Sequence, residues 1–166
     1  MTADKAVAVD TNVLLSATAP VRSLHRAALA VLNDWPNQGV VLAASGQVFR
    51  EYLVTATRPV DVNGLGLDVG SALFNVGEFR GRMRLLSEGE WAWAHLTDLV
   101  ARYGCRGKQI HDANLVAAAL ASGVDALVTA NVRDFARFST EVEIIDLAAV
   151  GGSSRGGRKP FSSASR

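Results

Sequence analysis

The stretch VAVDTNVLL, residues 7–15, decides the fold, because an acidic and an amide side chain interrupt an otherwise apolar run near the N-terminus. Short runs of β-branched and aliphatic residues are typical of buried strands, so residues 7–9 predict a strand that ends at Asp10. Asp10 could cap a helix that begins near Asn12, because aspartate accepts hydrogen bonds from free helix N–H groups. It could also hold a metal ion, since ligands of open α/β proteins bind beyond the carboxyl ends of the strands. The stretch alone leaves both interpretations open.

Length and composition are those of one globular domain. The chain has 166 residues, 49% of them hydrophobic and 20% charged, with a formal net charge of +1. This charge gives no general affinity for polyanions, so a nucleic-acid contact would require a local basic patch. A single cysteine, Cys105, excludes an internal disulfide and a cysteine-based metal cluster and fits a reducing, cytoplasmic location.

Neither an export signal nor a membrane span is expected. No apolar stretch of the sequence reaches the ~18–20 residues that cross a bilayer. Asp10 and Asn12 split the N-terminal apolar region that a signal peptide would need. The sequence therefore predicts no contact with a membrane.

Periodicity predicts strands and helices that alternate along the chain. Apolar residues at three- and four-residue steps indicate helices, and short apolar runs indicate strands. The expected strands lie at 7–9, 40–43, 85–86, 126–129 and 142–145. The expected helices lie at 21–35, 45–57, 69–82, 90–103 and 110–121, with a short helical turn at 133–138. This order predicts an α/β sandwich with a mostly parallel sheet of about four or five strands.

Local signals add detail to these elements. Ser45 is expected to cap the second helix, and the residue pair 58–59, Arg-Pro, to end it. In the helix at 90–103 the expected inward-facing residues are Trp91, Leu96, Leu99 and Val100. From Gly151 the chain is rich in Gly, Ser and Arg, which predicts a domain at 1–150 and a disordered basic tail at 151–166.

Four acidic residues are expected near one edge of the sheet. Asp10 ends the first strand, and Glu51 lies on the helix after the second. Asp112 is in the first turn of the alanine-rich helix, and Asp134 follows the fourth strand. Strand ends and the helix starts that follow them converge on one edge of a parallel sheet. Glu51 lies further along its helix and must reach back toward that edge, for which its longer side chain is suited.

Each acid also has a simpler structural explanation. Glu51 could be a solvated helix residue paired with Arg50 or Arg58. Asp112 could complement a helix dipole, and Asp134 could cap a short helix. Against all of these, Asp112 lies beside an Ala/Leu/Val-rich segment that is expected to be buried. Clustered buried carboxylates repel one another unless a cation neutralises them.

Oxygen ligands without cysteine or a paired histidine motif point to Mg²⁺ or Mn²⁺. One such ion, or two about 4 Å apart, can orient a water, lower its pKa and stabilise the charge on a phosphate. The acids therefore predict phosphodiester chemistry. His111 stands beside Asp112, but neighbours on a helix point in different directions, so it is expected to be at most a surface or substrate contact.

Four stretches of the chain carry a family resemblance. They are VDTNVLL at 9–15, SGQVFREYLVTATRP at 45–59, KQIHDANLVAAAL at 108–120 and LVTANVRDFARF at 127–138. Each alone is a weak motif, but all four in this order resemble the PIN-domain ribonucleases and, more narrowly, the VapC-type toxins of bacterial toxin–antitoxin modules. The resemblance covers residues 5–147. It implies a PIN-like α/β/α sandwich and a cytoplasmic, Mg²⁺- or Mn²⁺-dependent endoribonuclease.

The resemblance also implies roles for individual residues. Asp10, Glu51 and Asp112 would form the acidic site, with Asp10 and Asp112 as the direct metal ligands. Asn12 and Thr129 would hold the site together by hydrogen bonds.

The fourth acidic position of the family departs from its usual pattern here. The acid often stands two residues after the threonine, where this chain has Asn131, and Asp134 comes three residues later. We expect Asn131 to line the site and Asp134 to contribute at longer range.

The partners implied by the resemblance are single-stranded or structured RNA, a second copy in a homodimer, and a VapB-type antitoxin whose C-terminal segment occupies the active-site groove. The candidate RNA contacts are Arg50, Lys108 and Arg133, with Arg22, Arg58 and Arg106. Each of them, taken singly, is more typical of a solvated surface charge. Two alternatives are a non-catalytic PIN-fold module that binds RNA or protein, and a nuclease that acts on DNA. The three acids argue against a binding module, which has no reason to keep mutually repelling carboxylates.

Overall fold

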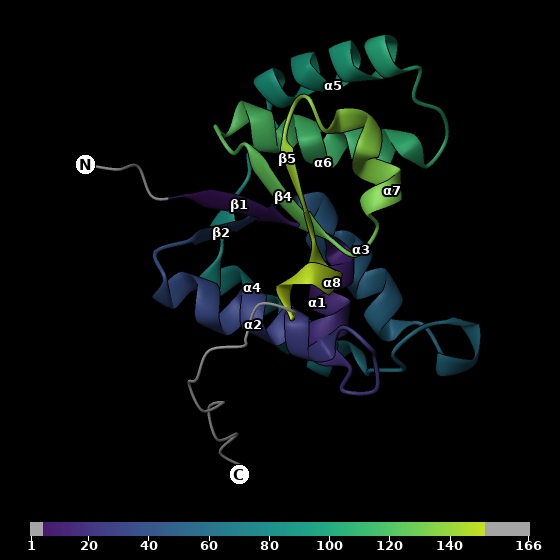
Figure 1. Cartoon of the computed structure of the whole chain (residues 1–166). Helices are drawn as coiled ribbons and strands as arrows, with labels where there is room; N and C mark the ends of the chain where they lie inside the picture. Colours follow the sequence, from purple (N-terminus) through teal and green to yellow (C-terminus); the bar gives the residue numbers. More distant parts are fainter. Residues whose placement is uncertain (1–4, 152–166) are drawn as a thin grey trace.

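A parallel sheet of five strands forms the centre of the computed structural model, which describes residues 5–151 (Figure 1). The strands are β1 (Ala6–Val9), β2 (Val41–Ala44), β3 (Arg84–Leu85), β4 (Ala126–Thr129) and β5 (Glu143–Asp146). Their order in the sheet is β3-β2-β1-β4-β5, and every neighbouring pair is parallel. The predicted α/β fold with a mostly parallel sheet is confirmed.

Helices cover both faces of this sheet. The longer ones are α1 (Thr11–Thr18), α2 (His25–Asn37), α3 (Gly46–Thr57), α4 (Val69–Arg82), α5 (Glu90–Tyr103) and α6 (Gln109–Ala121). The short ones are α7 (Val132–Phe135), α8 (Leu147–Val150) and the 3₁₀ turns η1 (Val60–Val62) and η2 (Ala136–Phe138). Figure 1 shows α5 and α6 on one side of the sheet and α1 and α2 on the other. Because both faces are covered, the four residues of β4 are all buried, as an apolar central strand requires.

Two helices of the structure are missing from the sequence prediction, and one begins later than predicted. α1 starts directly after Asp10, so the helix that Asp10 could cap does exist. Its buried residues include the polar Thr11 and Ser16, so this short helix lacks the apolar period that a longer amphipathic helix shows. α8 has only four residues. α2 begins at His25 instead of residue 21, because residues 20–24 form turns and bends.

The inward-facing side of α5 is predicted correctly except at one position. Leu96 and Leu99 are buried, and Val100 packs against the core. Trp91 is 78% exposed, so the prediction for it is wrong. The buried stripe of α5 begins instead at Ala92, and Trp91, one residue earlier, is rotated by about 100° away from it.

Residues 1–4 and 152–166 lie outside the described residues. The predicted basic tail at 151–166 is therefore represented only by Gly151. Across residues 5–151, none of the helices combines the length and the apolar character that a bilayer crossing requires.

The order of strands reverses between β1 and β4. The chain adds β2 and β3 on one side of β1, and later adds β4 and β5 on its other side. Ligands of open parallel sheets bind outside the carboxyl ends of the strands at such a reversal. Asp10 directly follows β1, and Thr129 is the last residue of β4, so both stand at this point.

Candidate active site

Three of the predicted acids line one pocket at the carboxyl edge of the sheet. Asp10, Glu51 and Asp112 share a cavity of about 450 Å³ with Asn131. We call this cavity the acidic pocket. Thr11, Asn12 and Arg58 also line it, as do Arg50, Leu15, Val54 and Thr55. The structure thus brings together Asp10 after β1, residues of α1, α3 and α6, and Asn131 after β4, which lie far apart in the sequence.

Asp10 is held by three hydrogen bonds at the bottom of this pocket. Its Oδ1 accepts a bond from the Thr11 backbone N–H at 2.7 Å, which caps α1. Its Oδ2 accepts from Asn12 Nδ2 at 2.6 Å and from Thr129 Oγ1 at 2.7 Å. Asp10 is only 8% exposed, and this burial raises its pKa above the ordinary value although the hydrogen bonds act in the opposite direction. Asp10 is therefore both a helix cap and an acid of the pocket.

Asn12 and Thr129 connect the ends of the two central strands. Asn12 Oδ1 accepts from the Ala130 N–H at 2.9 Å, and Thr129 Oγ1 accepts from the Asn131 N–H at 2.9 Å. Asn12 Nδ2 also donates to Thr129 Oγ1 at 3.2 Å. These bonds fix the backbone after β4 against the start of α1, which places Asn131 beside Asp10.

Glu51 is held by two neutral donors, one on each carboxylate oxygen. Thr11 Oγ1 donates to Oε2 at 2.8 Å, and Gln47 Nε2 donates to Oε1 at 2.7 Å. The alternative in which Glu51 pairs with Arg50 or Arg58 is wrong, because none of the ion pairs found among residues 5–151 involves Glu51. Arg50 instead lies 3.6 Å from Glu88. The Glu51 carboxylate is thus oriented without being neutralised.

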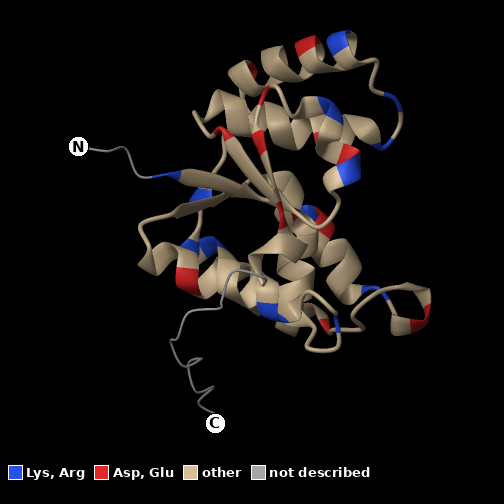
Figure 2. Ribbon diagram, viewed as in Figure 1, with Lys and Arg blue, Asp and Glu red and all other residues tan. Residues whose placement is uncertain are grey.

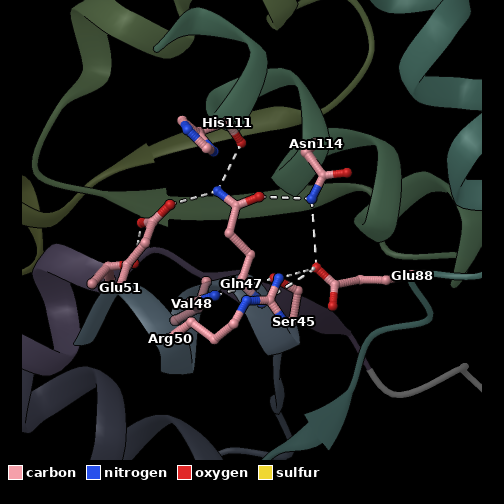
Figure 3. Close-up of polar contacts among 9 residues, drawn as sticks. Ser45, Gln47, Val48, Arg50, Glu51, Glu88, His111 and Asn114 are labelled. Carbon is pink, nitrogen blue, oxygen red and sulfur yellow. Dashed lines mark hydrogen bonds and ion pairs between the residues drawn. The ribbon is translucent and has the colours of Figure 1, made fainter. Parts of the chain in front are cut away.

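Gln47 is the residue that ties Glu51 to α6, and sequence analysis missed it. Gln47 is only 7% exposed, and Figure 3 shows its amide between Glu51 and Asn114. Besides Glu51, Nε2 donates to the His111 carbonyl oxygen at 3.0 Å, and Oε1 accepts from Asn114 Nδ2 at 2.6 Å. Its position four residues before Glu51, on the same face of α3, is the one sequence signal that could have revealed it.

A carboxylate from another segment covers the start of α3 behind Gln47. Glu88 Oε1 accepts from the Gln47 backbone N–H at 3.2 Å and from Asn114 Nδ2 at 3.5 Å. A side chain at Gly46 would have its Cβ only 2.7 Å from Glu88 Oε2. Glycine at this position therefore lets the acid approach the helix end.

Asp112 differs from the other two acids because no donor holds it. Within residues 5–151 its carboxylate takes part in none of the hydrogen bonds, and it is half-buried in the first turn of α6. Loss of solvation raises its pKa to about 6, together with repulsion from Asp134, Asp10 and Glu51. Lys108 opposes this shift only in part. Asp112 is the acid whose charge the surrounding protein compensates least.

Asn131 and Asp134 differ in their position relative to the acidic pocket. Asn131 lines the acidic pocket, whereas Asp134 does not. Asp134 lies in the first turn of α7 without capping it, so the capping alternative is wrong. It is nevertheless the acid that repels Asp112 most strongly.

Only some of the candidate RNA contacts lie at the acidic pocket. Arg50 and Arg58 line the acidic pocket, and Lys108 acts on Asp112 by its charge. Arg22, Arg106 and Arg133 do not line it. Figure 2 shows basic and acidic residues interspersed over the helices, as the small net charge suggests. Any affinity for phosphate must therefore be local.

The acidic pocket offers the donor set that a hard divalent cation prefers. Carboxylate oxygens line it, and neither cysteine nor histidine does. Among residues 5–151, no three His, Cys, Asp or Glu side chains stand close enough together to hold an ion as they are placed. The residues present fit such an ion by their chemistry and by the charge of Asp112, which Lys108 compensates only in part.

A family model described as PIN domain matches residues 6–133. No curated protein matches the chain.

Several solved structures share the fold. VapBC2 from Rickettsia felis, bound to a DNA fragment from the promoter, is 15% identical with a TM-score of 0.62, over 85% of this chain and 98% of that one. DNA-bound VapBC from Salmonella typhimurium is 20% identical with a TM-score of 0.61, over 86% and 98%. VapC20 from Mycobacterium tuberculosis, a toxin that cleaves the sarcin-ricin loop, is 16% identical with a TM-score of 0.56, over 73% and 86%.

Thr129→Val tests the support of Asp10, because valine keeps the shape of threonine and removes its hydroxyl. We expect the free energy of unfolding at neutral pH to fall by about 1–3 kcal/mol, the cost of a buried acceptor that loses its donor. The hydroxyl lowers the pKa of Asp10, so it favours the charged form. The loss should therefore shrink as the pH falls and Asp10 takes up a proton. Urea denaturation at a series of pH values measures this.

Thr129→Ser is the matched control, since serine keeps the hydroxyl and loses only a methyl group. Its loss of stability should not depend on pH in this range. A valine variant with the same pH-independent loss would contradict the role given to the hydroxyl.

Proposed function

The chain belongs to the PIN-domain family, and on that premise we propose that it is a divalent-metal-dependent endoribonuclease that acts as the toxin of a toxin–antitoxin pair in the cytoplasm. One observation carries the proposal. Three carboxylates from distant parts of the chain line one pocket, and among residues 5–151 no hydrogen-bond donor compensates the charge of Asp112. The solved VapBC and VapC20 structures with the same fold support the toxin assignment.

Asp10 and Asp112 would hold Mg²⁺ or Mn²⁺ in the acidic pocket, with Glu51, Asn131 and Asp134 completing the catalytic set. Once bound, the ion would activate a water and stabilise the charge on the phosphate that is attacked. Asp10 is kept from rotating by its three hydrogen bonds, supported by Asn12 and Thr129. The ligand is therefore pre-oriented, so little conformational entropy is lost when it coordinates.

Glu51 is suited to orient a water next to the ligands. Each of its oxygens accepts one hydrogen bond from the protein and keeps the capacity to accept another. Asn131 adds a neutral polar side chain to the same pocket, and Asp134 influences Asp112 through its charge. Arg50 and Arg58 at the pocket would bind phosphate groups of the RNA.

The proposed partners are a cognate VapB-type antitoxin and a second copy of the chain. Exposed apolar side chains on α3 and α4 support such contacts, since apolar surface of this kind marks interaction sites. They are Val54, Val69, Leu73 and Phe74.

Cleavage of RNA is the direct test. The purified protein should cut RNA in the presence of Mg²⁺ or Mn²⁺, and EDTA should abolish the cutting because the acids alone repel phosphate. Asp112→Asn should abolish cleavage and relieve growth arrest on expression. Asp125→Asn, an exposed acid outside the acidic pocket, is the control and should behave as the wild type. Cleavage that persists in EDTA would reject the proposal, and a preference for DNA would change the substrate class.

Asp134→Ala tests how the fourth acid acts. We expect it to slow cleavage by about tenfold at most, the equivalent of one pKa unit on Asp112. Asp10→Ala and Asp112→Ala remove proposed ligands and should each cost more than about 100-fold. Initial rates on one RNA substrate measure all three variants. An equal loss in all three would overturn the distinction between the pocket acids and Asp134.

The pKa of Asp112 also predicts a pH-dependent stability of the metal-free protein. The folded state binds this proton more tightly than the unfolded state, so stability should fall as the pH rises from about 4 through about 6. Asp112→Asn removes the cost of the charge. At pH 7.5 in EDTA it should raise the stability by about 1 kcal/mol, discounted for solvent screening of a half-exposed group. This corresponds to a Tm increase of about 2–4 °C.

Thermal unfolding with and without Mn²⁺ measures this effect. The gain should vanish near pH 4, and Mn²⁺ should stabilise the wild type more than the variant, because the ion binds only the folded state. A variant that is no more stable than the wild type at pH 7.5 would show that the Asp112 charge is already compensated.

A further inference from the structure

A second pocket adjoins the acidic pocket and shares Arg50 and Glu51 with it. Its volume is about 290 Å³. The residues that line only this pocket are Gln47, Leu96, Ile110, His111 and Asn114. Because the two cavities share a wall, whatever occupies the second one lies directly beside Glu51. We call it the side pocket.

The side pocket combines an apolar surface with a flat aromatic ring. Ile110 is 39% exposed although it is apolar, and Leu96 from α5 is buried next to it. The His111 side chain is exposed and takes part in none of the hydrogen bonds found among residues 5–151. Only its backbone carbonyl is used, by Gln47, as Figure 3 shows. The imidazole ring is therefore available for stacking.

The polar edge of the side pocket has one unused acceptor. Gln47 Nε2 donates both of its hydrogens, one to Glu51 and one to the His111 carbonyl oxygen. Asn114 Nδ2 donates to Gln47 and to Glu88, which orients the Asn114 amide. Its Oδ1 accepts none of the hydrogen bonds found in the described part of the chain and could accept one from the edge of a ligand. Arg50 adds a cation on the wall between the pockets.

We propose that the side pocket receives one unpaired nucleobase of the substrate, adjacent to the phosphodiester that lies in the acidic pocket. The inference rests on the proposed function, because it takes RNA as the substrate. Single-stranded RNA is recognised by bases that stack on aromatic or arginine planes and form hydrogen bonds along their edges. The pocket offers each of these groups, and its volume is at the lower limit of ligand sites, which suits one base.

Binding of RNA with single missing bases tests the proposal. The full chain carrying Asp112→Asn is used in EDTA, which lowers the negative charge of the acidic pocket and prevents cleavage. The probe is a labelled single-stranded oligoribonucleotide of mixed sequence, together with a series in which one residue at a time is abasic. Fluorescence anisotropy gives the affinities. We expect one abasic position to weaken binding about tenfold, the effect of losing one stacked base.

His111→Ala removes the ring, and Ile110→Trp fills the pocket. In both variants the same abasic position should no longer weaken binding, because the base has already lost its site. The matched controls are His95→Ala and Val62→Trp, whose side chains line neither pocket, and both should keep the tenfold effect. The proposal is overturned if no abasic position matters, if the effect persists in both variants, or if RNA does not bind.

A separate cleavage assay with Mn²⁺ on the wild-type chain keeps the two proposals apart. Base-dependent binding through His111 without any cleavage would retain the side pocket and reject the nuclease. Cleavage together with an unaltered response to abasic residues would retain the nuclease and reject the base site.

Discussion

The repulsion among carboxylates at the carboxyl edge of the sheet is the constraint on which the rest of the site depends. Three acids share one pocket, and the protein compensates them unequally. Asp10 receives three hydrogen bonds and Glu51 two, whereas Asp112 receives none within the described chain. Burying a charge without a partner is costly, so such a pocket is not expected from selection for stability alone. It is explained if a cation completes it.

The same hydrogen bonds also fasten the fold. Thr129 and Asp10 are 119 residues apart, and Thr11 and Glu51 are 40 apart, yet each pair is joined by one direct bond. Gln47 reaches across 64 residues to the His111 carbonyl. These links hold β1, β4, α3 and α6 in fixed positions around the pocket. The geometry of the acids and the stability of the domain therefore depend on the same few polar side chains. Substituting one of these side chains is expected to change both the geometry and the stability.

Sequence patterns predicted the parts of this structure that depend on local properties. The strands and α5 follow from apolar runs and helical spacing, and the edge where Asp10 and Thr129 meet follows from the rule that parallel strands end on one side. The family resemblance predicted Asn12 and Thr129, which hold Asp10, but neither it nor the local patterns predicted the partners of Glu51. Gln47, buried beside Glu51, depends on how α3 faces α6, and the exposure of Trp91 depends on the rotation of α5. Both are set by tertiary packing, which a single sequence does not encode locally.

If the proposed function holds, Arg50 would let the acidic pocket accept phosphate despite the negative charge of the pocket. In the structure its guanidinium is paired with Glu88 at 3.6 Å, and its side chain is 68% exposed. Such exposed ion pairs contribute only about 0–1 kcal/mol, so exchanging Glu88 for a phosphate costs little. Glu88 would keep its bonds to the Gln47 N–H and to Asn114. The Arg50 guanidinium can therefore exchange Glu88 for a phosphate while Gln47 and Asn114 stay in place. Substrate would then bind to a site that is already ordered.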